Sequence, residues 1–298
     1  MSSGARIAAF VSLLAAIFAS AALAGGALDP GGNDDRGQAA GHGGASAQRD
    51  GQAGEHGDGP ADGPDAARHE PAADGPAGVA STQDGLRLVV DRSRFTAGRP
   101  ATLRFRILDA ANRALRDFDV EQARRMHLIV VRRDLRRFQH LHPRLGSGGA
   151  WTVRLKLPEA GVYRAFADFR TGGVRRTLGI DLFVPGSFEP LDVPAPAASA
   201  SVDGYDVALD DDGAGRLSFA VRRDGRAVAD LDPYLGSRGH LVVLREGDLA
   251  YDHAHPVDGG QDEIAFETGS EPGTYRLFLQ FRHRGRIRTA AFTRTVTR

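Results

Sequence analysis

The histidines of this 298-residue chain are concentrated in two short segments that repeat one pattern. Six of the ten histidines fall in these segments. The first copy reads His127-Leu128-Ile129-Val130-Val131, Asp134-Leu135 and His140-Leu141-His142-Pro143, and the second reads His240-Leu241-Val242-Val243-Leu244, Asp248-Leu249 and His253-Ala254-His255-Pro256. In each copy a lone histidine precedes a His-x-His doublet by thirteen residues. Imidazole is a common ligand for zinc and copper, so the pattern indicates transition-metal chemistry.

Each histidine segment reads as strand, tight turn, strand. A two-residue turn at Gly247-Asp248 would place His240 opposite His255 on the neighbouring strand. The equivalent turn of the first copy places His127 opposite His142. Strand side chains alternate between the two faces, so both histidines of a doublet point the same way.

Three imidazoles per hairpin are therefore predicted to share one face, with Cβ separations of about 5 to 8 Å. Pro143 and Pro256 donate no ladder hydrogen bond and are predicted to end their strands at the rim of a sheet. The sequence thus predicts two metal sites, with the ligands His127, His140, His142, His240, His253 and His255.

Three neutral imidazoles with an open fourth position suit a copper or zinc ion. The chain has no cysteine, which excludes thiolate sites and disulfides, and only two methionines. Met126 adjoins His127 and is predicted to face the other side of the strand. No acid/base residue accompanies the histidines in both copies, and no nucleophile elbow or phosphate-binding loop is present, so the chain is predicted not to be an enzyme.

An alternative interpretation gives the histidines a structural role. Rim hydrogen bonds to the backbone or to Asp168 and Asp252 could brace each hairpin, and the same carboxylates could orient metal-bound imidazoles. The chain would then be a cell-envelope structural or interaction protein. His283 is predicted to be a surface histidine, and Tyr163 and Tyr275 are predicted to be corner tyrosines that bond the backbone.

The N-terminal part of the chain is predicted to direct export. Residues 7–28 are apolar and uncharged after Arg6, and residues 1–28 are either a cleaved signal peptide or a membrane anchor. Residues 29–82 are rich in Gly, Ala, Asp, Pro and His and are predicted to be a disordered linker. We expect an extracytoplasmic protein, secreted or anchored to the outer face of the cytoplasmic membrane, with a metal ion and no nucleic acid as partner.

Alternating apolar and polar residues predict short strands after the linker, as in Leu86–Val90, Ala101–Leu108 and Trp151–Leu157. A short helix is expected only around Val120–Arg125. The fold class is predicted to be all-β, with two tandem immunoglobulin-like or cupredoxin-like β-sandwich domains. These cover residues 83–185 and 199–298, and a proline-rich linker at 186–198 separates them.

The histidine motifs, together with Gly161–Phe169 and the run from Pro233 to Pro256, resemble a group of uncharacterised exported proteins of high-GC Gram-positive bacteria with repeated His-x-His-Pro sandwich domains. The resemblance covers about residues 84–298. It implies an N-terminal membrane segment, an extracytoplasmic part and a link to heavy-metal handling, and it supplies no catalytic residues. Asp252 stands where an apolar residue is expected before His253.

Overall fold

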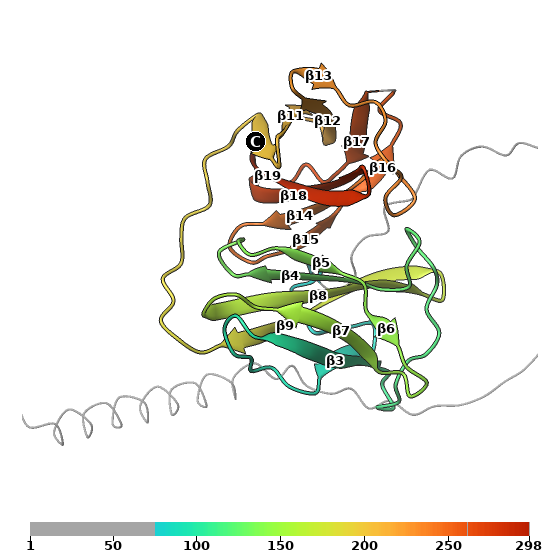
Figure 1. The fold of residues 1–298 in the computed structure, drawn as a ribbon. Helices are drawn as coiled ribbons and strands as arrows, with labels where there is room; N and C mark the ends of the chain where they lie inside the picture. The colour runs from blue at the N-terminus through green and yellow to red at the C-terminus, as the bar shows by residue number, and fades with distance from the viewer. Residues whose placement is uncertain (1–74, 261, 298) are drawn as a thin grey trace, which may run out of the picture. The chain divides into compact units, whose positions relative to one another are not determined.

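The computed structural model describes residues 75–260 and 262–297 (Figure 1). The predicted signal or anchor segment and the linker up to residue 74 lie outside these residues. Within the described ranges no helix is long and apolar enough to cross a membrane.

The described residues form four antiparallel sheets. In the first repeat, one sheet has the order β1 (Thr82–Gln83), β2 (Leu86–Val90), β3 (Pro100–Leu108), β7 (Trp151–Lys156) and β6 (Arg144–Leu145), and the other has β5 (Gln139–Leu141), β4 (His127–Arg132), β8 (Gly161–Thr171) and β9 (Val174–Val184). In the second repeat, one sheet has β10 (Ser199–Val202), β11 (Tyr205–Asp211), β12 (Arg216–Arg223), β17 (Glu263–Glu267) and β16 (His255–Val257), with β13 (Arg226–Ala227) beside β12, and the other has β15 (Tyr251–His253), β14 (Gly239–Arg245), β18 (Gly273–His283) and β19 (Arg286–Val296).

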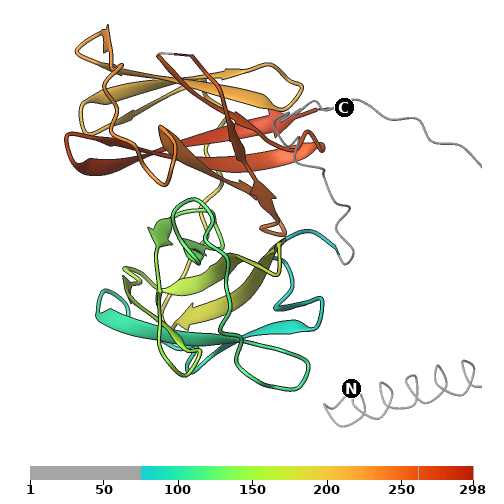
Figure 2. The ribbon, with the colours of Figure 1, turned by 90° about the vertical axis from the view of Figure 1, so that its right-hand side faces the viewer.

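Each repeat is a β-sandwich, which confirms the predicted all-β fold. In the first, alternate residues of β3 such as Phe105 and Ile107 are fully buried and pack with Trp151. In the second, Phe219 of β12 packs with Phe281 of β18 across the other core. Alternation of apolar and polar residues along these strands is the pattern of a sheet with one buried face. Figures 1 and 2 show the paired layers of each repeat.

The β4 sheet also buries its outer face, because it packs against the β14 sheet of the second repeat. Every residue of β4 is buried. Leu128 and Val130 enter the core of their own sandwich, whereas Ile129 and Val131 lie in a third cluster with Val242 and other residues of the second repeat. The uninterrupted apolar runs of β4 and β14 are thus explained by burial on both faces. The histidines lie on the face of the β4 sheet that this third core covers.

The prediction of a short helix around Val120–Arg125 is wrong. Glu121 and Arg124 exchange two backbone hydrogen bonds, of 2.7 and 2.9 Å, across a tight turn. The two residues between them, Gln122 and Ala123, have φ of 45° and 61°. Positive φ at both central positions defines a type I′ hairpin turn, which no right-handed helix can contain.

The two corner tyrosines are confirmed. Tyr163 donates its hydroxyl to the carbonyl of Glu159 at 3.0 Å, and Tyr275 donates to the carbonyl of Glu271 at 2.9 Å. Both acceptors lie four residues upstream of the tyrosine, in the loop that leads into β8 or β18. The same hydrogen bond in both sandwiches shows that the internal repeat is structural as well as sequential.

Candidate functional site

Three histidines of the first repeat come together at the end of the β4–β5 hairpin. The ladder pairs Leu128 with Leu141 and Ile129 with His140, which is the predicted register. His127 Nδ1 lies 3.0 Å from His140 Nε2, and the His142 ring centroid lies 4.8 Å from that of His140 and 5.3 Å from that of His127. One ring nitrogen from each histidine lies within 4.8 Å of the other two.

The second hairpin does not bring its three histidines together. Val242 pairs with His253, as the predicted register requires, but β15 ends there. The next strand, β16, pairs with β17 in the opposite sheet, so that His255 stands against Glu267 and is exposed. The expectation that His255 faces His240 is therefore wrong, because the chain changes sheets between the two residues of the doublet.

Pro256 also departs from its predicted place. It lies within β16, an edge strand, where a residue without a backbone N–H is tolerated. In the first repeat the chain likewise moves to the opposite sheet, but only after the doublet is complete, at Pro143 and β6. The different crossing point explains why one repeat assembles the cluster and the other does not.

His240 of the second repeat lies against the first cluster. Its ring is stacked on His127, with an interplanar angle of 10° and centroids 5.5 Å apart, and its centroid is 4.6 Å from that of His140. Both His127 and His240 are 4% exposed. The histidine cluster is thus part of the surface that joins the repeats, which the hairpin motif of a single repeat does not reveal.

Gln280, on β18, fixes the orientation of His140. Its side-chain Nε2 donates to Thr289 Oγ1 at 3.3 Å, which leaves Oε1 to accept from His140 Nδ1 at 2.6 Å. A neutral His140 that donates through Nδ1 carries its lone pair on Nε2, the atom that faces His127. No sequence signal identified Gln280, because nothing links it to the hairpin motif.

Burial keeps the three imidazoles neutral. It lowers the pKa of His127 and of His142 to about 4, assisted by the charge of Arg124 at both rings and by His127 at His142. Burial also lowers the pKa of His140 well below its usual value, and the neighbouring histidines add to the effect. His142 Nε2 is buried and has no hydrogen-bond partner among the described residues. Neutral imidazoles are the form that binds metal ions.

A buried carboxyl lies beside the cluster. Asp168 stands opposite His127 in the β4–β8 ladder and accepts a hydrogen bond from Thr177 Oγ1 at 3.0 Å. Burial raises the pKa of Asp168 to about 7. Asp252 is the carboxylate that was predicted to brace the second hairpin. It accepts a hydrogen bond from the backbone N–H of Gly269 at 2.9 Å.

These pKa shifts predict how stability depends on pH. Because the pKa of His127 and His142 is about 4 in the folded chain and about 6.5 when unfolded, the free energy of unfolding should fall as the pH drops from 6.5 to 4. Asp168 acts in the opposite direction, since its folded pKa lies above its unfolded value. We expect urea unfolding midpoints to fall over this range, and to fall more steeply in Asp168→Asn. If the wild-type chain or Asp168→Asn became more stable as the pH fell toward 4, the assigned pKa shifts of His127 and His142 would be contradicted.

His283 is not a surface residue, contrary to the sequence prediction. It is 4% exposed, its Nδ1 lies 2.7 Å from the hydroxyl of Tyr205, and its Nε2 lies 3.2 Å from a carboxylate oxygen of Asp230. Both contacts belong to the second sandwich; the Tyr205 contact is a hydrogen bond, whereas the Asp230 contact leaves Nε2 without a hydrogen bond among the described residues.

Solved structures similar to this chain include an adhesin and a fibronectin type III segment. The Escherichia coli adhesin FdeC is 12% identical, with a TM-score of 0.25, over 73% of this chain and 65% of the adhesin, so the chain spans less than two thirds of that protein. A two-domain fibronectin type III segment of chicken tenascin is 12% identical, with a TM-score of 0.22, over 70% of this chain and 97% of the segment. Among curated proteins, none matches the chain.

One family model matches the chain twice, over residues 80–186 and 200–298. Its description is "Domain of unknown function (DUF8832)". The two matches together cover more than half of the sequence and coincide with the two sandwiches. The chain therefore belongs to the DUF8832 family and contains two copies of its domain.

Proposed function

We propose that this chain is a non-enzymatic, extracytoplasmic protein that binds one copper or zinc ion through His127, His140 and His142. The observation that carries the proposal is the convergence of three neutral imidazoles, with one ring nitrogen of each within 4.8 Å of the others. The expectation of two sites is thereby reduced to one, because His255 lies in another sheet.

The geometry requires only small movements to accept an ion. Bonds of about 2.0 to 2.1 Å in tetrahedral geometry separate ligand nitrogens by roughly 3.3 Å. His127 and His140 already lie near this separation, at 3.0 Å. His142 would approach by a change of side-chain rotamer, and its Nε2 has no hydrogen bond among the described residues to give up.

Two of the three rings have a hydrogen-bond acceptor beside the nitrogen that would not bind the ion. Such an acceptor would stabilise the tautomer whose other nitrogen is free to bind a metal. His140 donates to Gln280 through Nδ1, which leaves Nε2 for the ion. His127 Nε2 lies 3.3 Å from the carbonyl of Glu121, so that a proton on Nε2 would free Nδ1 for the ion. Such outer hydrogen bonds are typical of histidines that bind metals.

The ligand set favours copper or zinc and a binding function. Nitrogen ligands place Cu²⁺ highest in affinity among the common divalent ions, and Zn²⁺ accepts the same geometry. His240 lies beside the three proposed ligands, with its ring centroid 4.6 Å from that of His140. The apolar segment at residues 7–28 supports an extracytoplasmic location, with either a cleaved signal or a retained anchor.

The proposal is tested by metal titration of the full chain. Metal-free protein is titrated with Zn²⁺ or Cu²⁺ in the presence of a competing chelator, which suppresses weak binding to the linker histidines His42, His56 and His69. We expect one ion per chain to compete with the chelator. Two tight ions per chain would restore the two-site model. Binding of no ion would favour the alternative, a cell-envelope structural or interaction protein whose histidines only brace the hairpins.

A further inference from the structure

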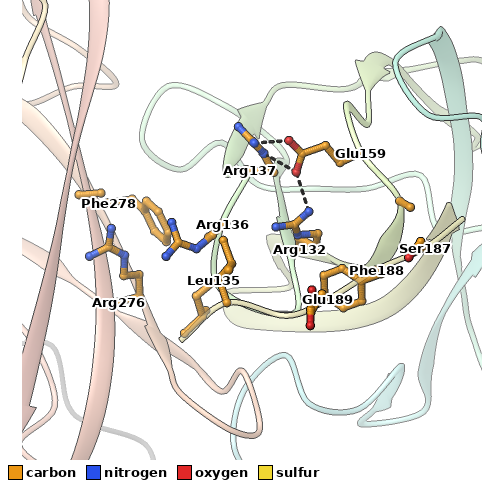
Figure 3. Close-up of a pocket in the computed structure, with 13 residues that line it drawn as sticks. Arg132, Leu135, Arg136, Arg137, Glu159, Ser187, Phe188, Glu189, Arg276 and Phe278 are labelled. Atoms are coloured by element: carbon orange, nitrogen blue, oxygen red, sulfur yellow. Dashed lines mark hydrogen bonds and ion pairs between the residues drawn. The ribbon is translucent and has the colours of Figure 1, made fainter. Parts of the chain in front are cut away.

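A pocket lies beside the β4–β5 turn, away from the histidine cluster. Its volume is about 730 Å³, within the range of small-molecule sites. It is lined by residues of the turn, of the segment that joins the repeats, and of β18 and β19: Arg132, Leu135, Arg136, Arg137, Glu159, Ala160, Ser187, Phe188, Glu189, Leu191, Arg276, Phe278 and Ala291 (Figure 3).

Two of the four arginines in this pocket are neutralised. Arg132 forms ion pairs with Asp134 at 2.7 Å and with Glu159 at 2.6 Å. Arg137 also pairs with Glu159, as the dashed lines of Figure 3 show. These groups form a closed network of charge, which leaves them little capacity for a ligand.

Arg136 and Arg276 are different, since neither forms an ion pair within the described ranges. Arg136 donates one hydrogen bond, to the carbonyl of Asp192 at 3.1 Å, and Arg276 donates one, to Thr293 Oγ1 at 2.9 Å. The Nε atoms of both side chains are buried and have no hydrogen-bond partner among the described residues. Each guanidinium therefore retains donors that nothing described in the protein satisfies.

The two guanidinium groups also lie close enough to repel each other. Figure 3 shows them side by side at one end of the pocket. Burial lowers the pKa of Arg276, and the charge of Arg136 lowers it further. Arg136 and Arg276 carry two positive charges. Glu189, which lines the pocket without an ion pair to either arginine among the described residues, carries one negative charge. One additional negative charge between the guanidiniums would therefore balance the site.

The pocket also has apolar walls. Phe188 and Leu191 come from the segment between the repeats, and Phe278, which stacks on Phe138 with ring centroids 4.2 Å apart, comes from β18. Guanidinium groups bind carboxylates through paired N–H donors, whereas aromatic and aliphatic walls stabilise hydrocarbon.

We propose that this pocket binds a small organic carboxylate, whose oxygens accept from Arg136 and Arg276 and whose hydrocarbon part lies against Phe188 and Leu191. Phosphate shares the oxyanion chemistry but has no apolar part to place against these walls. The proposal does not depend on metal binding, because the pocket contains none of the histidines.

The test is a titration of metal-free full-length chain with benzoate, hexanoate, acetate, benzamide and inorganic phosphate, followed by calorimetry or NMR. Keeping the protein metal-free prevents carboxylates from binding through an ion at the histidines. We expect saturable binding of benzoate and hexanoate, with acetate, benzamide and phosphate weaker by about tenfold or more.

Three variants assign the binding to the pocket. Arg136→Gln and Arg276→Gln should each weaken benzoate binding by about tenfold, since each removes a charged donor. Arg154→Gln, which changes an exposed arginine outside the pocket, should leave it unchanged. Unfolding midpoints should not fall in Arg276→Gln, because one of two repelling charges is removed.

Three results would overturn the proposal. One is the absence of saturable benzoate and hexanoate binding to folded wild-type chain. Another is binding that both glutamine variants retain. The third is phosphate or acetate binding as tight as that of benzoate, which would show that the apolar walls play no part.

Discussion

Replacing His142 by alanine is expected to lower the affinity for Cu²⁺ or Zn²⁺ by about 100-fold or more. The substitution removes one of three proposed ligands, and the loss of even an outer hydrogen bond behind a ligand typically costs about 10- to 100-fold. The fold should tolerate the change, because His142 Nε2 has no hydrogen-bond partner among the described residues. Chelator-competition titration measures the effect.

The matched control is His255→Ala. The corresponding histidine of the second doublet is exposed and lies in β16, in the sheet opposite to that of His240. Its replacement should change the affinity by less than about twofold, within the scatter expected of a surface change. Equal losses in the two variants would contradict the single-site assignment, as would full affinity in His142→Ala.

The largest effect on stability is expected for Phe166→Ala. Phe166 is fully buried in the cluster between the repeats, where its ring lies 5.6 Å from that of Tyr251. Truncation of a buried phenylalanine costs about 3 to 5 kcal/mol through lost burial and the cavity left behind. Urea unfolding should show this loss, and the two sandwiches should then unfold in separate steps because their shared core is weakened.

Phe183→Ala provides the comparison. This phenylalanine is 41% exposed at the end of β9, and its replacement should cost less than about 1 kcal/mol. A loss in Phe166→Ala no larger than in Phe183→Ala would show that the cluster between the repeats contributes little. The metal affinity of Phe166→Ala should also decrease, since Gln280 and His240 reach the site from the second repeat.

The hairpin register could be predicted from the sequence because local rules determine it. Alternation of side chains and the turn residues place His127 opposite the doublet, and the observed pairing of Ile129 with His140 agrees. The tyrosine corners were predictable for the same reason, since the hydroxyl of Tyr163 reaches a carbonyl only four residues away.

The crossing of the second hairpin could not be predicted, because both repeats carry the same His-x-His-Pro spacing. In the first repeat the chain pairs with the opposite strand β7 only after Pro143, whereas in the second repeat it pairs with β17 from His255 onward. Long-range pairing of this kind leaves no local pattern.

The contribution of the second repeat to the histidine site could not be predicted from the sequence, for a related reason. Uninterrupted apolar runs such as those after His127 and His240 are typical of strands buried on both faces, but they do not indicate which surface covers the second face. Packing of the β4 sheet on the β14 sheet brings Gln280 to His140 across 140 positions of sequence.

The turn at Gln122 and Ala123 could not be told from a helix by its sequence, because its residues are good helix formers.

The most direct test of the proposed site is anomalous diffraction from crystals of the chain loaded with Zn²⁺. We predict one strong peak about 2.0 to 2.2 Å from a ring nitrogen of each of His127, His140 and His142. A peak bound instead at the second doublet, or crystals with no ordered ion beside these three histidines, would contradict the account.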